Sequence, residues 1–180
     1  MNVDPNEIQK FESLAHRWWD PDGEFRPLHD INNTRLKYIN DRIRVESLDV
    51  LEVGCGGGIL TQSLAELGAV TTGIDAASGP LRVAQLHAIE THMDEKIRYI
   101  ESTAESFAEV EPESFQVVAA LEMLEHVPDF RSTVHALATL TRPGRMVFLS
   151  TINRNTKAYL MAILGAEYVL NLLPRGTHDY

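Results

Sequence analysis

Two carboxylates and a histidine stand within five residues of one another, directly after an apolar stretch that predicts a strand. Glu122, Glu125 and His126 are spaced i, i+3 and i+4, so one helical turn would point all three side chains the same way. Such a group could hold a divalent metal, with magnesium as one candidate, or serve acid–base catalysis. Alternatively, the carboxylates stabilise a helix N-terminus, and His126 is a lone base or a surface residue. This segment is the candidate catalytic site.

A glycine-rich turn follows the apolar residues 50–53, and its glycines include Gly54, Gly56 and Gly58. Because glycine lacks a Cβ, the backbone there can adopt positive φ and a ligand can approach the main chain closely. The N–H groups that open the next helix would face that ligand. The pattern therefore predicts a strand, a tight turn and a helix arranged around a bound molecule.

Asp75 ends a second apolar stretch, residues 70–75, and follows Gly54 by 21 residues. A carboxylate at that place can accept hydrogen bonds from both ribose hydroxyls of a nucleoside. The dinucleotide fingerprint G-x-G-x-x-G would need glycine at position 59, which is Ile59, so a nicotinamide-dependent oxidoreductase is disfavoured. The G-x-G-x-G spacing instead resembles the first motif of class I S-adenosylmethionine-dependent methyltransferases. A turn in some other doubly wound protein is the third interpretation.

Apolar strands alternate with helical patterns, which predicts a mostly parallel sheet with helices on both faces. The predicted strands are residues 50–53, 70–75, 97–100, 115–120 and 146–150, with a turn at residues 142–144 before the last. Ser78 is the predicted N-cap of the helix after the second strand. In doubly wound α/β folds, ligands bind at the carboxyl ends of the strands, where the strand order reverses. The residues at those ends are Gly54, Asp75, Leu121 and Asn153.

The residues before the first strand predict two helices. Asp4, with a proline directly after it, is the predicted N-cap of the first, and residues 8–18 place apolar side chains on one of its faces. Residues 36–43 belong to the second helix. We expect both to lie over the ligand end of the sheet, with Trp18 and Trp19 as hydrophobic packing.

Length, composition and charge limit the class of protein. The 180 residues fit one domain, and 44% hydrophobic with 23% charged residues is typical of a soluble globular chain. A net charge of -10 without clustered Lys or Arg argues against a nucleic-acid partner. One cysteine, Cys55, and no apolar N-terminal stretch argue against secretion and favour a cytoplasmic protein.

Motifs spread over nearly the whole chain point to a narrower group. They are Arg17-Trp18-Trp19-Asp20, Gly23-Glu24-Phe25, Pro27-Leu28-His29, Ile31-Asn32, Arg35-Leu36, the segment from Val53 to Leu60, Gly73-Ile74-Asp75, the segment from Glu122 to Pro128, Asn153-Arg154 and Gly165-Ala166-Glu167-Tyr168. In these motifs the chain resembles the ubiquinone-biosynthesis O-methyltransferase family, whose members methylate hydroxyl groups of polyprenylated phenols and quinols. The resemblance implies a Rossmann-like class I methyltransferase fold.

The resemblance also implies a cofactor, sites and partners. The cofactor is S-adenosyl-L-methionine, and the function covers both O-methylation steps of ubiquinone biosynthesis. The cofactor-binding residues are Arg35, Gly54, Asp75 and Leu121, with Gly56 and Gly58 from the glycine motif. The catalytic residues, which are also the candidate metal ligands, are Glu122, Glu125 and His126. The implied partners are a polyprenylated phenol or quinol substrate and a ubiquinone-biosynthesis protein complex.

The expected organisation is one methyltransferase domain over residues 1–180. Residues 1–45 form an N-terminal helical segment, residues 46–153 the cofactor-binding core, and residues 154–180 an apolar helix facing substrate or membrane. Members of the family continue with two more strands, so the chain resembles a C-terminally truncated member that lacks them. A fragment that binds the cofactor without turnover is the alternative function.

Residues 158–173 predict an apolar helix of about 24 Å, shorter than a bilayer core of about 30 Å. Arg154, Lys157 and Arg175 flank it with positive charge in an otherwise acidic chain. This arrangement favours a helix lying on an anionic membrane, peripheral to its inner face. Burial of the same helix in the core is the alternative.

Overall fold

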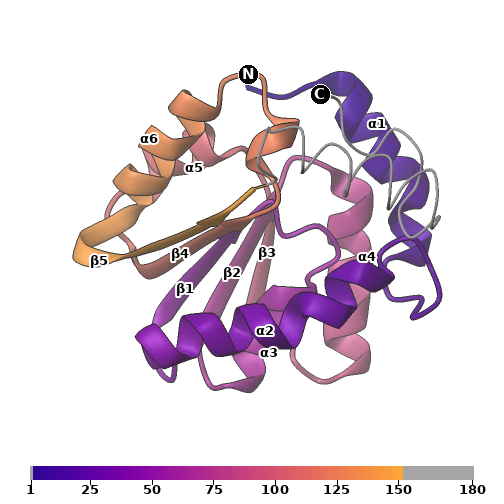
Figure 1. Ribbon diagram of the computed structural model, residues 1–180, viewed down its shortest axis with the longest axis horizontal. Helices are drawn as coiled ribbons and strands as arrows, with labels where there is room; N and C mark the ends of the chain where they lie inside the picture. Colours follow the sequence, from indigo (N-terminus) through magenta and orange to yellow (C-terminus); the bar gives the residue numbers. More distant parts are fainter. Residues whose placement is uncertain (1, 152–180) are drawn as a thin grey trace, which may run out of the picture.

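The computed structural model describes residues 2–151 and shows a five-stranded sheet with helices on both faces (Figure 1). The strands are β1 (Asp49–Val53), β2 (Val70–Asp75), β3 (Ile97–Glu101), β4 (Phe115–Leu121) and β5 (Thr141–Ser150). Their order is β3-β2-β1-β4-β5, and every neighbouring pair is parallel. The order reverses between β1 and β4, which confirms the predicted doubly wound α/β fold.

Helices pack on the two faces of the sheet because side chains alternate along each strand. The helices are α1 (Pro5–Leu14), the 3-10 helix η1 (Ala15–Arg17), α2 (Arg26–Arg42), α3 (Ile59–Glu66), α4 (Ser78–Glu90), α5 (Ala104–Val110), the 3-10 helix η2 (Leu124–His126) and α6 (Phe130–Leu140). Leu51 and Val53 of β1 pack with α5 and α6, whereas Val50 packs with α2 and α3. Glu52 shares the face of Val50, so its carboxylate is buried beneath α2 and α3.

Helix starts follow the sequence signals at α1 but not at α4. The Asp4 side chain accepts a hydrogen bond from the Asn6 N–H at 2.8 Å, as the predicted N-cap requires. The prediction that Ser78 caps α4 is wrong, because Ala77 occupies the N-cap and makes no side-chain cap. A carboxylate from α1 takes that role instead: Glu12 accepts the Gly79 N–H at 2.8 Å.

Two further details differ from the sequence prediction. The turn expected at residues 142–144 lies inside β5, whose pairing with β4 shifts register between Phe115 and Val117. A helix that the sequence does not predict, α5, connects β3 to β4. It has seven residues, too few to establish a helical period, and Thr103 caps it by accepting the Ser106 N–H.

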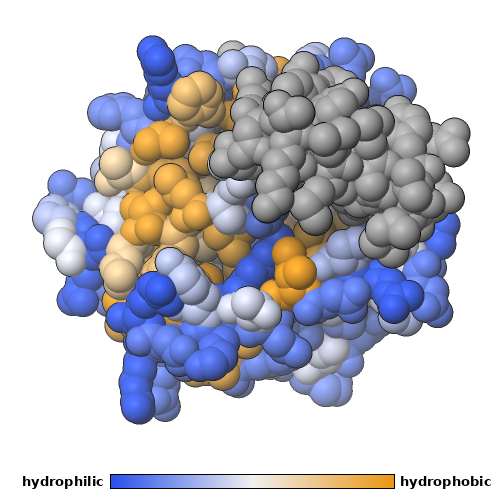
Figure 2. Space-filling view, viewed as in Figure 1, coloured by the Kyte–Doolittle hydropathy of each residue, from blue (hydrophilic) through white to orange (hydrophobic). Residues whose placement is uncertain are grey.

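At its β5 end, the described sheet presents apolar side chains to the surface. Met146, Val147 and Leu149 of β5 are exposed, and so is Val134 on α6. Figure 2 shows apolar residues gathered on the side of the molecule where α6 and β5 lie. The segment 154–180 and any later strands lie outside the described residues.

Candidate active site

A cavity of about 490 Å³ opens at the carboxyl ends of β1, β2 and β4, beneath α1 and α2. It lies where the strand order reverses, as the fold predicts. The predicted site residues that line it are Arg35, Gly54, Gly56, Asp75, Leu121, Glu122, Glu125 and His126. Gly58 is not among the lining residues, and it forms the N-cap of α3. The structure thus brings together all the predicted site residues except Gly58.

The glycine turn wraps around the end of β2. The N–H groups of Gly54 and Cys55 both donate to the Ile74 carbonyl, at 2.9 and 3.1 Å. Gly54 has φ of 73°, and a Cβ there would lie 2.8 Å from the Met123 Cβ. The turn therefore needs glycine at position 54 both for its backbone conformation and for the close passage of the chain after β4.

Both oxygens of Asp75 are held by backbone N–H groups. Oδ2 accepts from Gly56 and Oδ1 from Ala77, each at 2.8 Å. Burial raises the pKa of Asp75, and these backbone hydrogen bonds act in the opposite direction. Each carboxylate oxygen keeps a second lone pair, so the group remains able to accept ribose hydroxyls. Asp75 lines the cavity, and the nucleoside role that the sequence predicts for it stays a prediction.

A second carboxylate, Glu52, is buried at the end of β1. Thr61 Oγ1 of α3 donates to Glu52 Oε2, and Arg35 of α2 is a nearby cation. Burial raises the pKa of Glu52 to about 7, although the Thr61 hydrogen bond and the Arg35 charge lower it. The floor of the cavity therefore holds a carboxyl group that titrates near neutral pH.

Arg35 and Glu122 form an ion pair across the cavity wall. The Ser150 hydroxyl donates to Glu122 Oε1, so both carboxylate oxygens of Glu122 have partners. Burial lowers the pKa of the Arg35 guanidinium, and the charge of Glu52 raises it. Arg35 Nε is buried and makes no hydrogen bond within residues 2–151, so it is a donor available to an anionic group in the cavity.

The expectation that Glu122, Glu125 and His126 converge on one helical turn is wrong. Glu122 has φ of 51° and precedes a 3-10 turn that begins at Leu124, so the helical spacing does not apply. Glu122 pairs with Arg35, while Glu125 accepts the Thr151 hydroxyl at 2.8 Å. Within the described part of the chain, no three His, Cys, Asp or Glu side chains form a group that could hold a metal ion. As arranged here, these residues do not fit a metal.

His126 faces α1 across the cavity wall. Its Nδ1 lies 2.7 Å from Glu7 Oε2, and its ring meets the Phe11 ring edge-on with centroids 5.3 Å apart. The imidazole is 17% exposed and lines the cavity. A histidine in this position can accept a proton from a molecule bound in the cavity.

The loop between η1 and α2 places two tryptophans over the glycine turn. Trp18 is buried and stacks on Phe25 with ring centroids 3.8 Å apart. Trp19 Nε1 donates to the Gly57 carbonyl at 2.9 Å, and its ring stacks on His87. The predicted packing role of both tryptophans is confirmed, and their contacts join the N-terminal segment to the glycine turn.

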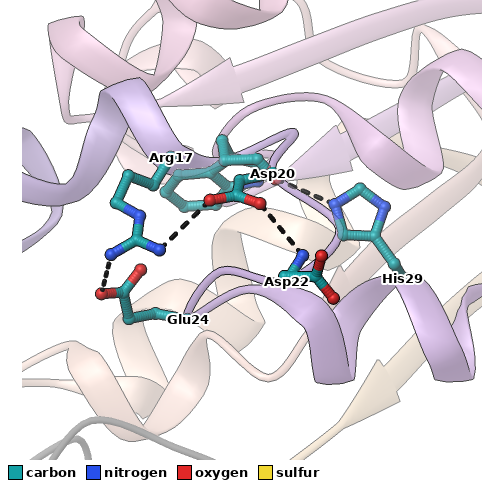
Figure 3. A network of polar contacts seen from close by, with 6 residues as sticks. Arg17, Asp20, Asp22, Glu24 and His29 are labelled. Atoms are coloured by element: carbon teal, nitrogen blue, oxygen red, sulfur yellow. Dashed lines mark hydrogen bonds and ion pairs between the residues drawn. The ribbon is translucent and has the colours of Figure 1, made fainter.

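Polar contacts within the loop hold its shape. Figure 3 shows Arg17 reaching both Asp20, at 3.1 Å, and Glu24, at 2.9 Å, while Asp20 accepts the Asp22 N–H. His29 Nε2 lies 2.9 Å from the Trp18 carbonyl. The backbone hydrogen bond from Asp22 and the contact with Arg17 lower the pKa of Asp20. The loop therefore keeps a fixed form where it covers the glycine turn.

The sequence did not reveal several residues that line the cavity. Ser102 and Thr103 follow β3, and the rule that located Asp75 at the end of β2 applies to them as well. Glu7 and Phe11 gave no local signal, because an acid early in a helix and an apolar residue on its face are ordinary features of any amphipathic helix.

Comparisons with known proteins show which family the chain resembles in sequence. A family model described as a methyltransferase domain matches residues 28–178. The chain is 57% identical over 179 residues to the ubiquinone biosynthesis O-methyltransferase of Pseudomonas entomophila, covering 99% of this chain and 76% of that protein. It is 59% identical over 180 residues to the protein of that name from Albidiferax ferrireducens, covering 100% of this chain and 71% of the relative.

Solved structures support the fold. The crystal structure of magnesium protoporphyrin IX methyltransferase from Synechocystis PCC 6803 with bound SAH matches with a TM-score of 0.64 at 19% identity, covering 94% of this chain and 70% of that one. The same enzyme with bound SAM matches with a TM-score of 0.61 at 22% identity, covering 92% and 74%. At such identities the likeness concerns the fold, whereas the sequence relatives define the family. The chain belongs to the ubiquinone biosynthesis O-methyltransferase family.

Proposed function

We propose that the chain transfers a methyl group from S-adenosylmethionine to a phenolic hydroxyl of a polyprenylated ubiquinone precursor, at both O-methylation steps. The observation that supports this most is that Asp75 and His126 line the same cavity. Asp75 can accept the ribose hydroxyls of a nucleoside, and His126 can accept the proton of a phenol. The names of the curated relatives agree with the proposal.

The residues around the cavity fit the cofactor. Asp75 would accept its ribose hydroxyls, and the Gly54 turn allows close approach of the main chain. Arg35 Nε, buried without a hydrogen bond among the described residues, would donate to its carboxylate. Leu121 offers an apolar surface at the end of β4. When bound, S-adenosylmethionine supplies the methyl group as a sulfonium.

The phenol must lose its proton for efficient transfer. A phenol with a pKa of about 10 is ionised to about one part in a thousand at pH 7, a deficit of about 4 kcal/mol. His126 lowers this barrier by accepting the proton as the oxygen attacks. The remaining catalysis is positioning, since the oxygen, the methyl carbon and the sulfur must be in line. Trp18, Phe25 and residues of α1 line the cavity and would exclude water from the bound reactants.

Calorimetry and product analysis test the proposal together. The chain is titrated with S-adenosylhomocysteine and, separately, with NADH, and then incubated with S-adenosylmethionine and a short-prenyl catechol. We expect S-adenosylhomocysteine alone to bind, and mass spectrometry to detect the monomethyl ether. Binding of NADH instead would favour an oxidoreductase. Binding of S-adenosylhomocysteine without any methyl ether would favour a fragment that only holds the cofactor.

We also propose a peripheral position on the cytoplasmic face of the membrane, where a polyprenylated substrate resides, with a ubiquinone-biosynthesis protein complex as a further partner. None of the helices formed by residues 2–151 has the length and apolarity that a membrane span requires. The interfacial helix predicted for residues 158–173 lies outside the described residues. Co-sedimentation with anionic liposomes at low salt, weakened by Leu160→Glu, is the expected result. Equal binding to neutral liposomes would contradict it.

A further inference from the structure

We propose that Glu7 is a positioning residue for His126, so that the proton acceptor of methyl transfer is completed by the N-terminal helix. This inference rests on the proposed function. The two residues are separated by more than a hundred positions in the chain, yet Glu7 Oε2 lies 2.7 Å from His126 Nδ1. A carboxylate beside one imidazole nitrogen selects which nitrogen carries the proton.

The surroundings of this pair restrict both side chains. Glu7 is 24% exposed and His126 is 17% exposed, and Phe11 meets the imidazole edge-on. Glu7 Oε2 is buried and makes no hydrogen bond of regular geometry within residues 2–151, although His126 Nδ1 lies 2.7 Å away. The other oxygen, Oε1, lies 3.6 Å from Lys10 Nζ. Glu7 is thus held between a lysine and the histidine.

Contacts on both sides of Glu7 fix the position of α1. Before the helix, Asn2 Nδ2 donates to Glu105 Oε1 at 2.8 Å, and Asn2 Oδ1 accepts the Asp129 N–H at 2.8 Å. In the last turn of the helix, Glu12 accepts the Gly79 N–H of α4. The Glu7 carboxylate therefore reaches His126 from a helix that is anchored on both sides of Glu7.

The geometry assigns a proton path. Because the Glu7 carboxylate lies beside Nδ1, it favours the tautomer with its proton on Nδ1, and Nε2 is then the nitrogen that accepts the phenol proton. The phenol oxygen forms its bond to the methyl carbon as the carbon–sulfur bond breaks, and the electron pair of that bond stays on sulfur. The imidazolium, stabilised by the Glu7 carboxylate, then releases the proton to water. The products are a methyl ether, S-adenosylhomocysteine and one proton, so charge and atoms balance.

The test compares Glu7→Gln with Glu12→Gln, a matched change on the same helix that alters an anchor but not the histidine. Methyl transfer is measured with catechols whose hydroxyl pKa falls through ring substitution. We expect Glu7→Gln to lower kcat by about 10- to 100-fold with the least acidic catechol, and progressively less with more acidic ones. The Kd for S-adenosylhomocysteine should stay within about twofold. Any defect in Glu12→Gln should not depend on the acidity of the catechol.

A His126→Gln background separates positioning from folding. If Glu7 acts through His126, Glu7→Gln causes no further loss of kcat in that background. Long-range nitrogen–proton NMR of the wild-type chain should also find His126 protonated at Nδ1, and protonated at Nε2 in Glu7→Ala. Three results would overturn the role of Glu7 while leaving the proposed function intact. The first is a wild-type kcat in Glu7→Gln, and the second is a Glu7→Gln defect that does not depend on catechol acidity. The third is a wild-type chain whose His126 is protonated at Nε2. A wild-type chain that methylates no catechol would overturn the proposed function and this role with it.

Discussion

Trp18 lies so close over Gly56 that a Cβ at position 56 would be 2.0 Å from the indole Cζ2. A Cβ at Gly57 would lie 2.2 Å from the same ring system. The glycines of this turn therefore serve two purposes, since they open the cavity and also admit a tryptophan from the N-terminal segment. The glycine turn and the N-terminal segment are therefore in direct contact through the Trp18 side chain.

Gly56→Ala should destabilise the chain, because the new methyl group must displace Trp18 and because Gly56 has φ of 51°. Gly144→Ala is the matched control, since Gly144 has φ of 75° but nothing within 4 Å of its Cβ position. We expect Gly56→Ala to lose about 1 to 3 kcal/mol more than the control in urea unfolding. Equal losses in the two variants would show that Trp18 adapts without cost.

Asp75→Ala should weaken S-adenosylhomocysteine binding by about 1.5 to 3 kcal/mol, the range for hydrogen bonds to a charged group. Glu101→Ala is the control, because Glu101 is the register partner of Asp75 at the end of β3 and is exposed away from the cavity. Calorimetry of both variants measures the difference. An unchanged Kd in a folded Asp75→Ala chain would remove the nucleoside role from this residue.

These two predictions concern residues that sequence reasoning located, and the reason is physical. Asp75 and the glycine turn belong to one strand–turn–helix–strand unit, in which parallel geometry brings both strand ends to the same edge. Contacts between distant segments have no such local rule. Glu7 beside His126 and Glu12 at the start of α4 depend on where α1 packs, and the 3-10 turn after Glu122 depends on the pairing of its backbone with Ser150.

Glu52 should make stability fall as pH rises from about 4.5 to about 7. Burial raises its pKa to about 7, so the folded chain keeps a proton that the unfolded chain has already released in this window. The contribution is full below pH 4.5 and is lost through pH 7, a change of about 3 kcal/mol. Glu52→Gln should lack this component in urea unfolding at pH 5 and pH 7.5.

The exposed Glu109→Gln on α5 is the control for this pH dependence. It should follow the wild-type profile, since its side chain lies in solvent. The contrary result is that Glu52→Gln and wild type lose the same free energy of unfolding between pH 5 and pH 7.5. That result would mean that the Glu52 carboxyl is ionised throughout this range and that neighbouring groups offset the cost of burying its charge.

Glu122→Gln should destabilise the chain by about 1 to 3 kcal/mol, because it removes the ion-pair partner of the largely buried Arg35 guanidinium. Arg35→Gln should lower the free energy of unfolding by a similar amount, because it removes the ion-pair partner of Glu122. A double-mutant cycle measured by urea unfolding should give a double variant less destabilised than the sum of the single ones. Strict additivity would mean that the pair makes no energetic contribution.

The most direct test of the account is the rate of labelled methyl transfer to a short-prenyl catechol by the wild-type chain and by His126→Gln. The account predicts that the wild type forms the methyl ether and S-adenosylhomocysteine in equal amounts. It predicts that His126→Gln is slower by about 100-fold or more, with the Kd for S-adenosylhomocysteine within about twofold. Equal rates in the two chains would contradict His126 as the proton acceptor. A wild type that binds S-adenosylhomocysteine but forms no methyl ether would contradict the proposed reaction.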